Sequence, residues 1–187
     1  YFKLKNLRKG GKKMQKEPLR VAIIGLDTSH AVEFPRLMQD DSVPAEHRVS
    51  GMRATRCLRF ETPFQGKDGL DQRQAVLEKI GVEVTEDFDY AIGDCDAILL
   101  EVNDPALHWE YFSRCAKLGK PVFLDKPFAD TLENMNKIID LASKEGVRYF
   151  TASSLRYDLD MVEALSSGIK AESATIWGPV GKAASGS

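Results

Sequence analysis

The stretch Pro121-Val122-Phe123-Leu124-Asp125-Lys126-Pro127 organises the chain. It is an apolar run of strand type that ends in an acid, a base and a proline. In an open parallel sheet the ligand crevice lies beyond the carboxyl ends of the strands, so polar residues placed there face a ligand. Proline cannot continue a strand ladder, and it could fix the turn through a cis bond. The motif also fits an ordinary solvated turn, and the surrounding pattern decides between the two interpretations.

Patterns typical of strands and helices alternate on both sides of this stretch. Strands are expected at residues 19–25, 54–60, 82–85, 96–102, 121–125 and 147–151. Helices are expected at residues 32–38, 72–80, 87–92, 105–118, 131–146 and 157–166, and residues 39–51 are expected to form a loop. Short connections and right-handed crossovers then favour one fold class, an α/β protein with a doubly wound, Rossmann-like parallel sheet.

The composition is that of a globular domain with a substantial core. The chain has 187 residues, of which 43% are hydrophobic and 29% charged. No apolar run approaches the roughly 18 residues of a membrane span, so no membrane contact is expected. The cysteines and histidines are Cys57, Cys95, Cys115, His30, His47 and His108. Their number and spacing indicate neither a disulfide framework nor a metal site, and we expect no metal and a reducing, cytoplasmic location.

The charge is unevenly distributed. Residues 1–20 hold eight Lys/Arg against Glu17 alone, a balance of +7, so the remaining 167 residues carry −9. The basic segment lacks interleaved aromatic residues, a helical stripe and the apolar core of a secretory signal. We therefore predict a disordered leader over residues 1–17 and do not expect nucleic acid as a partner.

The pattern changes after the sixth predicted strand. Residues 171–177 alternate weakly, as a strand of a different sheet would, and a lone strand cannot hold itself together. We predict a nucleotide-binding domain over residues 18–155. Residues 156–187 would then be the start of a truncated α+β domain, to which the family resemblance described next gives substrate binding and oligomerisation.

The order of the motifs carries a family resemblance. The motifs are Val21–Gly25 with its following loop, Asn103-Asp104-Pro105 with His108, Gly119–Pro127, and Ser154-Leu155-Arg156-Tyr157. In this order they resemble the Gfo/Idh/MocA family of nicotinamide-dependent sugar and cyclitol oxidoreductases. The resemblance implies NAD or NADP as cofactor, a polyol substrate, hydride transfer and a homo-oligomer.

Lys126 matches the lysine of that family's Glu-Lys-Pro motif, which reaches toward nicotinamide and substrate. The resemblance makes Lys126 the expected catalytic and substrate-binding residue, because a fixed ammonium stabilises an alkoxide that forms as hydride leaves. Asp125 replaces the family's glutamate and is one methylene shorter, so its contact with the cofactor ribose depends on a shorter reach.

The phosphate loop departs from the dinucleotide fingerprint G-x-G-x-x-G. Residues 25–30 read Gly-Leu-Asp-Thr-Ser-His and keep only the first glycine, Gly25. Thr28 and Ser29 could donate to phosphate or merely cap the following helix. Asp27 would repel a diphosphate unless its carboxylate is turned away. These four residues are the expected cofactor contacts in the loop.

Five further residues have weaker assignments. Glu61 is a candidate ribose acid, whereas Arg59 nearby could favour a 2′-phosphate, so the sequence leaves NAD and NADP open. Asn103 should border the nicotinamide ribose. His108 is expected either to pack within a helix or to contact substrate, and Arg156 to contact substrate or to form a structural ion pair.

A different class of function remains open beside the dehydrogenase. The loss of two fingerprint glycines also fits a non-catalytic module that uses this fold to sense a nucleotide or sugar, or to pair with a partner protein. Such a module would bind without turnover.

Overall fold

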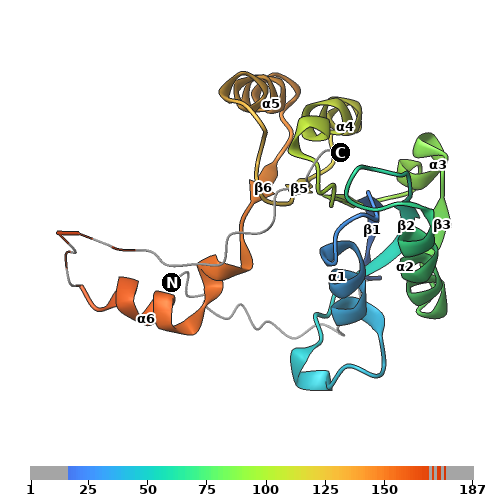
Figure 1. Ribbon diagram of the computed structural model, residues 1–187, viewed down its shortest axis with the longest axis horizontal. Helices are drawn as coiled ribbons and strands as arrows, with labels where there is room; N and C mark the ends of the chain where they lie inside the picture. Colours follow the sequence, from blue (N-terminus) through green and yellow to red (C-terminus); the bar gives the residue numbers. More distant parts are fainter. Residues whose placement is uncertain (1–16, 169, 171, 174, 176–187) are drawn as a thin grey trace, which may run out of the picture.

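A computed structural model describes residues 17–168, 170, 172, 173 and 175, and its six strands form one parallel sheet (Figure 1). The strands are β1 (Leu19–Ile24), β2 (Met52–Leu58), β3 (Glu83–Thr85), β4 (Ala97–Leu100), β5 (Val122–Leu124) and β6 (Tyr149–Thr151). Their order in the sheet is β3-β2-β1-β4-β5-β6, and every neighbouring pair is parallel. The predicted doubly wound α/β fold is confirmed.

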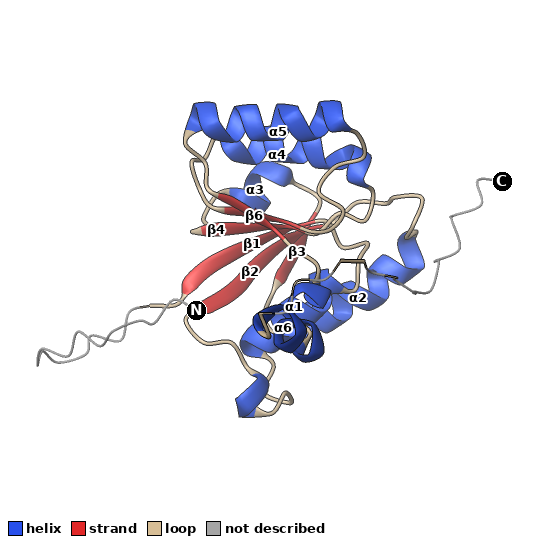
Figure 2. Cartoon of the chain, turned by 90° about the vertical axis from the view of Figure 1, so that its left-hand side faces the viewer, coloured by secondary structure: helices blue, strands red, loops and turns tan. Residues whose placement is uncertain are grey.

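Helices cover both faces of the sheet (Figure 2). They are α1 (His30–Gln39), α2 (Lys67–Lys79), α3 (Phe88–Ile92), α4 (His108–Ala116), α5 (Leu132–Glu145) and α6 (Leu159–Ser166), with short 3₁₀ segments η1 (Ala45–His47), η2 (Pro105–Leu107) and η3 (Ser154–Tyr157). The helices α1 and α2 pack on one face, and α3, α4 and α5 pack on the other.

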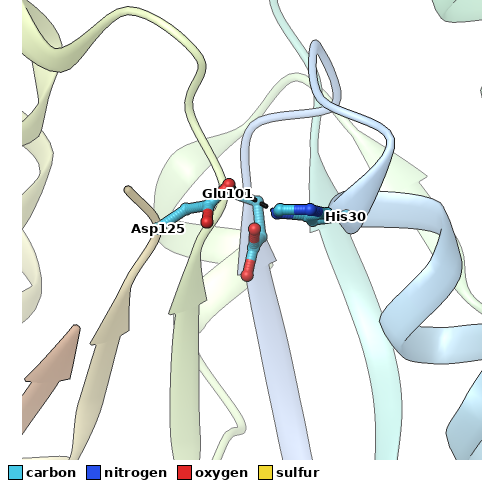
Figure 3. A group of neighbouring side chains, drawn as sticks. All are labelled: His30, Glu101 and Asp125. Atoms are coloured by element: carbon cyan, nitrogen blue, oxygen red, sulfur yellow. Dashed lines mark hydrogen bonds and ion pairs between the residues drawn. The ribbon is translucent and has the colours of Figure 1, made fainter. Parts of the chain in front are cut away.

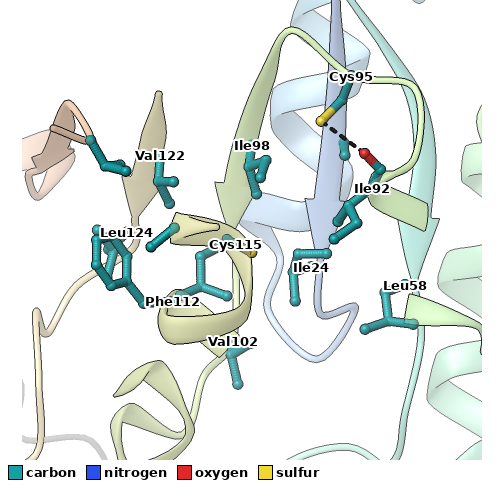
Figure 4. Close-up of a cluster of buried hydrophobic side chains, with 14 of the residues drawn as sticks. Ile24, Leu58, Ile92, Cys95, Ile98, Val102, Phe112, Cys115, Val122 and Leu124 are labelled. Atoms are coloured by element: carbon teal, nitrogen blue, oxygen red, sulfur yellow. Dashed lines mark hydrogen bonds between the residues drawn. The ribbon is translucent and has the colours of Figure 1, made fainter. Parts of the chain in front are cut away.

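The central strand shows why the sheet needs both helix layers. Residues 21–24 of β1 are buried, and successive side chains of a strand point to opposite faces. Ala22 and Ile24 join the core under α3, α4 and α5 (Figure 4), whereas Ile23 joins the core under α1 and α2. A continuous apolar strand is therefore buried on both sides, as expected for a parallel sheet.

Several helices differ from the predicted bounds by a few residues, and two of the differences have a clear physical reason. The helix α2 begins at Lys67, five residues before the predicted start, because its first turn is polar and is held by an ion pair between Lys67 and Asp71 rather than by an apolar stripe. The segment predicted as one helix from Pro105 starts as the 3₁₀ turn η2 before α4 continues. Asp104 caps this turn by accepting from the Ala106 N–H, and Pro105 at the first position of the turn loses no bond by lacking an N–H.

The carboxyl end of the described chain projects beside the sheet (Figure 1). The 3₁₀ segment η3 and the helix α6 expose several large apolar side chains, namely Leu155, Tyr157, Leu159, Met161, Val162 and Leu165. The predicted leader falls almost wholly on residues 1–16, which lie outside the described residues, and the strand expected at residues 171–177 is described only in part. The predicted domain division stays a prediction. In the part of the chain that is described, no helix has the length and apolar character to span a membrane.

Gly25 connects β1 to the loop before α1, and its conformation is one that only glycine adopts readily. Its φ is +97°, and a Cβ built there would lie 2.8 Å from the carbonyl oxygen of Glu101 and 2.9 Å from Cγ2 of Val102. Both neighbours follow β4, so the lack of a side chain lets the ends of β1 and β4 meet.

We predict that Gly25→Ala destabilises the fold by roughly 3 kcal/mol, since it combines a strained φ with a clash against backbone. Gly51→Ala is the matched control, because Gly51 has a φ of +89° and no atom within 4 Å of the built Cβ. The control should lose only about 1 kcal/mol. Urea denaturation measures both changes, and equal losses would contradict the crowding at Gly25.

Candidate functional site

Several of the predicted site residues lie at the topological switch point of the sheet. The strand β1 lies between β2 and β4, so the connections that leave β1 and β4 run to opposite sides. Loops at the carboxyl ends of strands open a crevice at such a switch point. Three segments meet there: residues 25–30 after β1, residues 101–104 after β4, and residues 125–127 after β5 (Figure 3).

Asp125 and Lys126 occupy this edge of the sheet but differ in exposure. Asp125 is 2% exposed; one carboxylate oxygen accepts from the Lys126 N–H at 2.8 Å, and the other lies 2.7 Å from Nδ1 of His30. Lys126 is exposed, and its peptide bond to Pro127 is cis. The sequence suggested that acid and base emerge together, whereas only the base reaches the surface. The Asp125 carboxylate holds the backbone of Lys126 and the imidazole of His30 in place.

Glu101 stands next to this pair, and no motif had marked it. It follows β4 directly, is fully buried, and neither of its carboxylate oxygens has a hydrogen-bond partner among the described residues. Burial, and then the negative charge of Asp125, raise the pKa of Glu101 well above its ordinary value. The one available signal in the sequence was an acid inside the apolar run of a central strand. The strand–helix pattern by itself predicts an ordinary core position there.

Asp27 is buried and hydrogen-bonded to two neighbouring loops. Its side chain is 3% exposed; one oxygen accepts from the Asn103 N–H at 2.9 Å and the other from the Thr62 hydroxyl at 2.8 Å. The carboxylate thus joins the loops after β1, β2 and β4. Because both oxygens are engaged below the surface, Asp27 presents no free carboxylate to a phosphate. The cofactor role expected of Asp27 stays a prediction, and these two internal bonds do not favour it.

Thr28 caps helix α1, whereas Ser29 makes no capping bond. The Thr28 hydroxyl accepts from the Ala31 N–H at 3.3 Å and so caps α1. The Ser29 side chain makes no capping bond and is exposed at the start of this ten-residue helix. A helix N-terminus carries partial positive charge and unsatisfied N–H groups, so Ser29 lies where an anion is favoured.

His108 is a packing residue. It is fully buried in α4, with Nε2 2.8 Å from the Val102 carbonyl oxygen and Nδ1 3.1 Å from that of Phe128. Each ring nitrogen therefore faces a carbonyl oxygen of the backbone that follows β4 or β5. Burial and these two neighbours favour helix packing, and the substrate contact stays a prediction.

The remaining predicted residues lie at the margins. Glu61 and Arg156 are exposed, and for Arg156 no ion pair is found within the described residues. Arg59 is engaged instead: its guanidinium lies 2.9 Å from Asp71 and 3.9 Å from Glu86. Asn103 is partly buried, and its N–H is committed to Asp27. The ligand roles of Glu61, Asn103 and Arg156 stay predictions.

A cavity of about 230 Å³ opens beside His30 and Asp125. Its wall is mainly aromatic, with Phe34, Phe123, Phe150 and Tyr157, and His30 and Asp125 contribute polar groups. The His30 ring stacks on Phe34 with ring centroids 5.2 Å apart. An apolar wall with a few convergent polar groups is the usual composition of a small-molecule site.

The residues present fit a dinucleotide in part. Gly25 keeps the tight turn of the fingerprint, the N-terminus of α1 is open to a diphosphate, and Asp27 is turned away. The third fingerprint glycine is replaced by His30, whose ring reaches across to Asp125 (Figure 3). Helix α1 still packs on the sheet through Ala31 and Val32, so the substitution changes the crevice rather than the fold.

Fold and site together define a Rossmann-type nucleotide-binding domain. The model of the Gfo/Idh/MocA family, described as an oxidoreductase family with an NAD-binding Rossmann fold, matches residues 19–153. The chain belongs to this family.

Individual relatives agree with this assignment. An inositol 2-dehydrogenase of Klebsiella pneumoniae subsp. pneumoniae is 42% identical over 112 residues, covering 57% of this chain and 33% of the relative. A probable dehydrogenase from Thermotoga maritima superposes with a TM-score of 0.60 at 25% identity, over 80% of this chain and 41% of that chain. An oxidoreductase from Agrobacterium radiobacter, in complex with NAD⁺, L-tartaric acid and magnesium, shares the fold with a TM-score of 0.59 at 18% identity, over 80% of this chain and 40% of that one. The chain spans about a third of the length of the first of these relatives.

The raised pKa of Glu101 predicts a pH-dependent loss of stability. The pKa of Glu101 is higher in the folded state than in the unfolded state. The contribution of Glu101 to stability is therefore complete below the unfolded-state pKa and is lost as pH rises through the folded-state pKa. In metal-free buffer the unfolding free energy should fall with rising pH, by up to about 1.4 kcal/mol per unit between the two pKa values.

Glu101→Gln should remove this slope, because an amide does not titrate. Glu110→Gln, at an exposed position on α4, should keep the wild-type profile. Urea unfolding between about pH 5 and about pH 8 compares the three proteins. Parallel profiles for wild type and Glu101→Gln would contradict the raised pKa.

Proposed function

We propose that the whole protein is a nicotinamide-dependent oxidoreductase that transfers hydride to or from a hydroxyl of a sugar-like or cyclitol substrate. The described chain would supply its cofactor domain. The observation that carries the proposal is the position of Lys126, exposed at the carboxyl edge of the sheet where the N-terminus of α1 also opens. A cation and an anion-binding helix end at one switch point suit a dinucleotide and a polar substrate together.

The chain's own residues have separate tasks in this proposal. Gly25 lets the loop turn tightly, and Ser29 with the N-terminus of α1 holds the diphosphate. Asp125 fixes the backbone of Lys126 and the ring of His30 through its two oxygens. Lys126 holds the substrate hydroxyl and stabilises negative charge on its oxygen. Bound nicotinamide would supply the hydride acceptor or donor.

We further propose a preference for NAD over NADP. Arg59 is the residue that the sequence offered to a 2′-phosphate, and its guanidinium is held by Asp71, Glu86 and the Gln74 side chain. A 2′-phosphate would have to compete with these acids.

Substrate, assembly and location are proposed from the family. The relatives named inositol 2-dehydrogenase favour a cyclitol, and the family resemblance favours a homo-oligomer. The three cysteines are free and buried, which favours a reducing, cytoplasmic location.

One observation supports the non-catalytic alternative. His30 stands in place of the third fingerprint glycine and is bonded across the crevice to Asp125, which narrows the space that a dinucleotide uses. A module of this kind would bind a nucleotide or sugar without turnover. Oxidation of myo-inositol or another polyol with NAD⁺ by the whole protein would exclude it.

Titration of the chain with NADH, followed by its fluorescence, tests the cofactor site. Wild type should bind NADH more tightly than NADPH. Ser29→Glu should weaken NADH binding about tenfold or more, since the added carboxylate repels phosphate, while the helix itself gains from a negative charge at its N-terminus. Ser29→Asn is the control and should bind nearly as wild type.

Lys126→Ala should likewise weaken binding or abolish turnover in the whole protein. The control is Lys117→Ala, because Lys117 is an exposed lysine at the C-terminal end of α4, away from the crevice. No NADH binding up to about 1 mM by a folded wild-type chain would count against the proposed function.

A further inference from the structure

His30, Glu101 and Asp125 form a cluster in which the proposed oxidoreductase chemistry gives Glu101 no task and uses Asp125 only to position Lys126 and His30. They come from the start of α1 and from the ends of β4 and β5, and 95 residues separate His30 from Asp125 (Figure 3). One imidazole nitrogen and one oxygen of each carboxylate lie within 4.8 Å of one another. Sequence spacing gave no hint of this grouping, because it is the folded sheet that brings the start of α1 and the ends of β4 and β5 together.

Glu101 is the member that points to a ligand. It is 0% exposed, and both of its carboxylate oxygens lack a partner among the described residues. Burying an ionised carboxylate without a partner is costly, so such groups normally pair with a cation or coordinate a metal. Asp125, 2% exposed, adds a second carboxylate at the same point. Two buried acids side by side cannot both ionise without cost, and one divalent cation at this point would offset that cost.

We propose that His30, Glu101 and Asp125 bind one divalent transition-metal ion of the zinc type. Catalytic zinc sites have three protein ligands, drawn from His, Cys and Asp/Glu, and keep a fourth position open. The open position would face the aromatic cavity that His30 and Asp125 line. The imidazole and the two carboxylates favour zinc over the all-oxygen sites of magnesium or calcium.

The geometry requires small adjustments, since the three ligand atoms are held only within 4.8 Å of one another. Ligand atoms on a tetrahedral zinc ion with bonds of about 2.0–2.2 Å lie roughly 3.4 Å apart. Nδ1 of His30 and Oδ2 of Asp125 are 2.7 Å apart, so they must separate by well under the width of an atom. The His30 side chain is 28% exposed and has room to move toward the cavity, whereas Asp125 is held by the Lys126 N–H. This backbone bond would orient the carboxylate as outer-sphere partners do in metal sites.

Calorimetric titration of the untagged, EDTA-treated chain with ZnCl₂ tests the site. One zinc ion per chain is expected to bind, with Mn²⁺ weaker and Mg²⁺ weaker still. Substitution by Co²⁺ should give the visible absorption of a tetrahedral centre. The measurement contains no nicotinamide, so its failure and the failure of NADH binding are separate results.

Matched variants locate the metal. Glu101→Gln and His30→Asn should each weaken zinc binding about 100-fold or more, because each removes a ligand. Glu110→Gln and His47→Asn alter exposed residues of the same types and should bind as wild type. His30→Asn, at a partly exposed position, decides the matter if Glu101→Gln does not fold by circular dichroism. No zinc binding by wild type, or binding unchanged in His30→Asn, overturns the proposal.

Discussion

The close approach of β1 and β4 at Gly25 is the constraint on which the site depends. The backbone N–H of Gly25 bonds to Leu58, and the N–H of Glu101 bonds to Ile24, so the ends of three strands are held in register. No Cβ fits between Gly25 and the Glu101 carbonyl. This contact places the start of α1 directly over the ends of β4 and β5. Every polar group of the site takes its position from that arrangement.

Buried polar residues then hold the loops of this edge. Asp27 connects the loops after β1, β2 and β4, and His108 connects the segments that follow β4 and β5. Each finds partners for its polar atoms, as buried polar groups generally must. Glu101 is the exception, and its unpaired carboxylate beside Asp125 makes it the least satisfied group in the described core. An unsatisfied buried acid at a ligand crevice indicates a functional role rather than a structural one.

The chain therefore keeps the fold of its family while altering the phosphate loop. A typical fingerprint uses three glycines to bring backbone close to a diphosphate. Here Asp27 and His30 replace two of them, and each has a defined partner inside the protein. Asp27 holds the loop in place through its bonds to Thr62 and Asn103. His30 adds an imidazole that contacts Asp125 in the crevice. Dinucleotide binding and metal binding would share one edge of one sheet.

The sequence by itself determined the strand–helix alternation and hence the parallel doubly wound sheet, because apolar runs and caps are local properties. It also marked the Asp125–Lys126 turn and Gly25, since a strand that ends in charge or glycine is visible in one stretch of residues. Only the tertiary structure decided that Asp27 and His108 are buried and bonded internally, and that His30, Glu101 and Asp125 meet. Strand order and helix docking bring together residues far apart in the chain. The partner of a buried polar atom therefore depends on the completed packing, which spacing along the sequence does not encode.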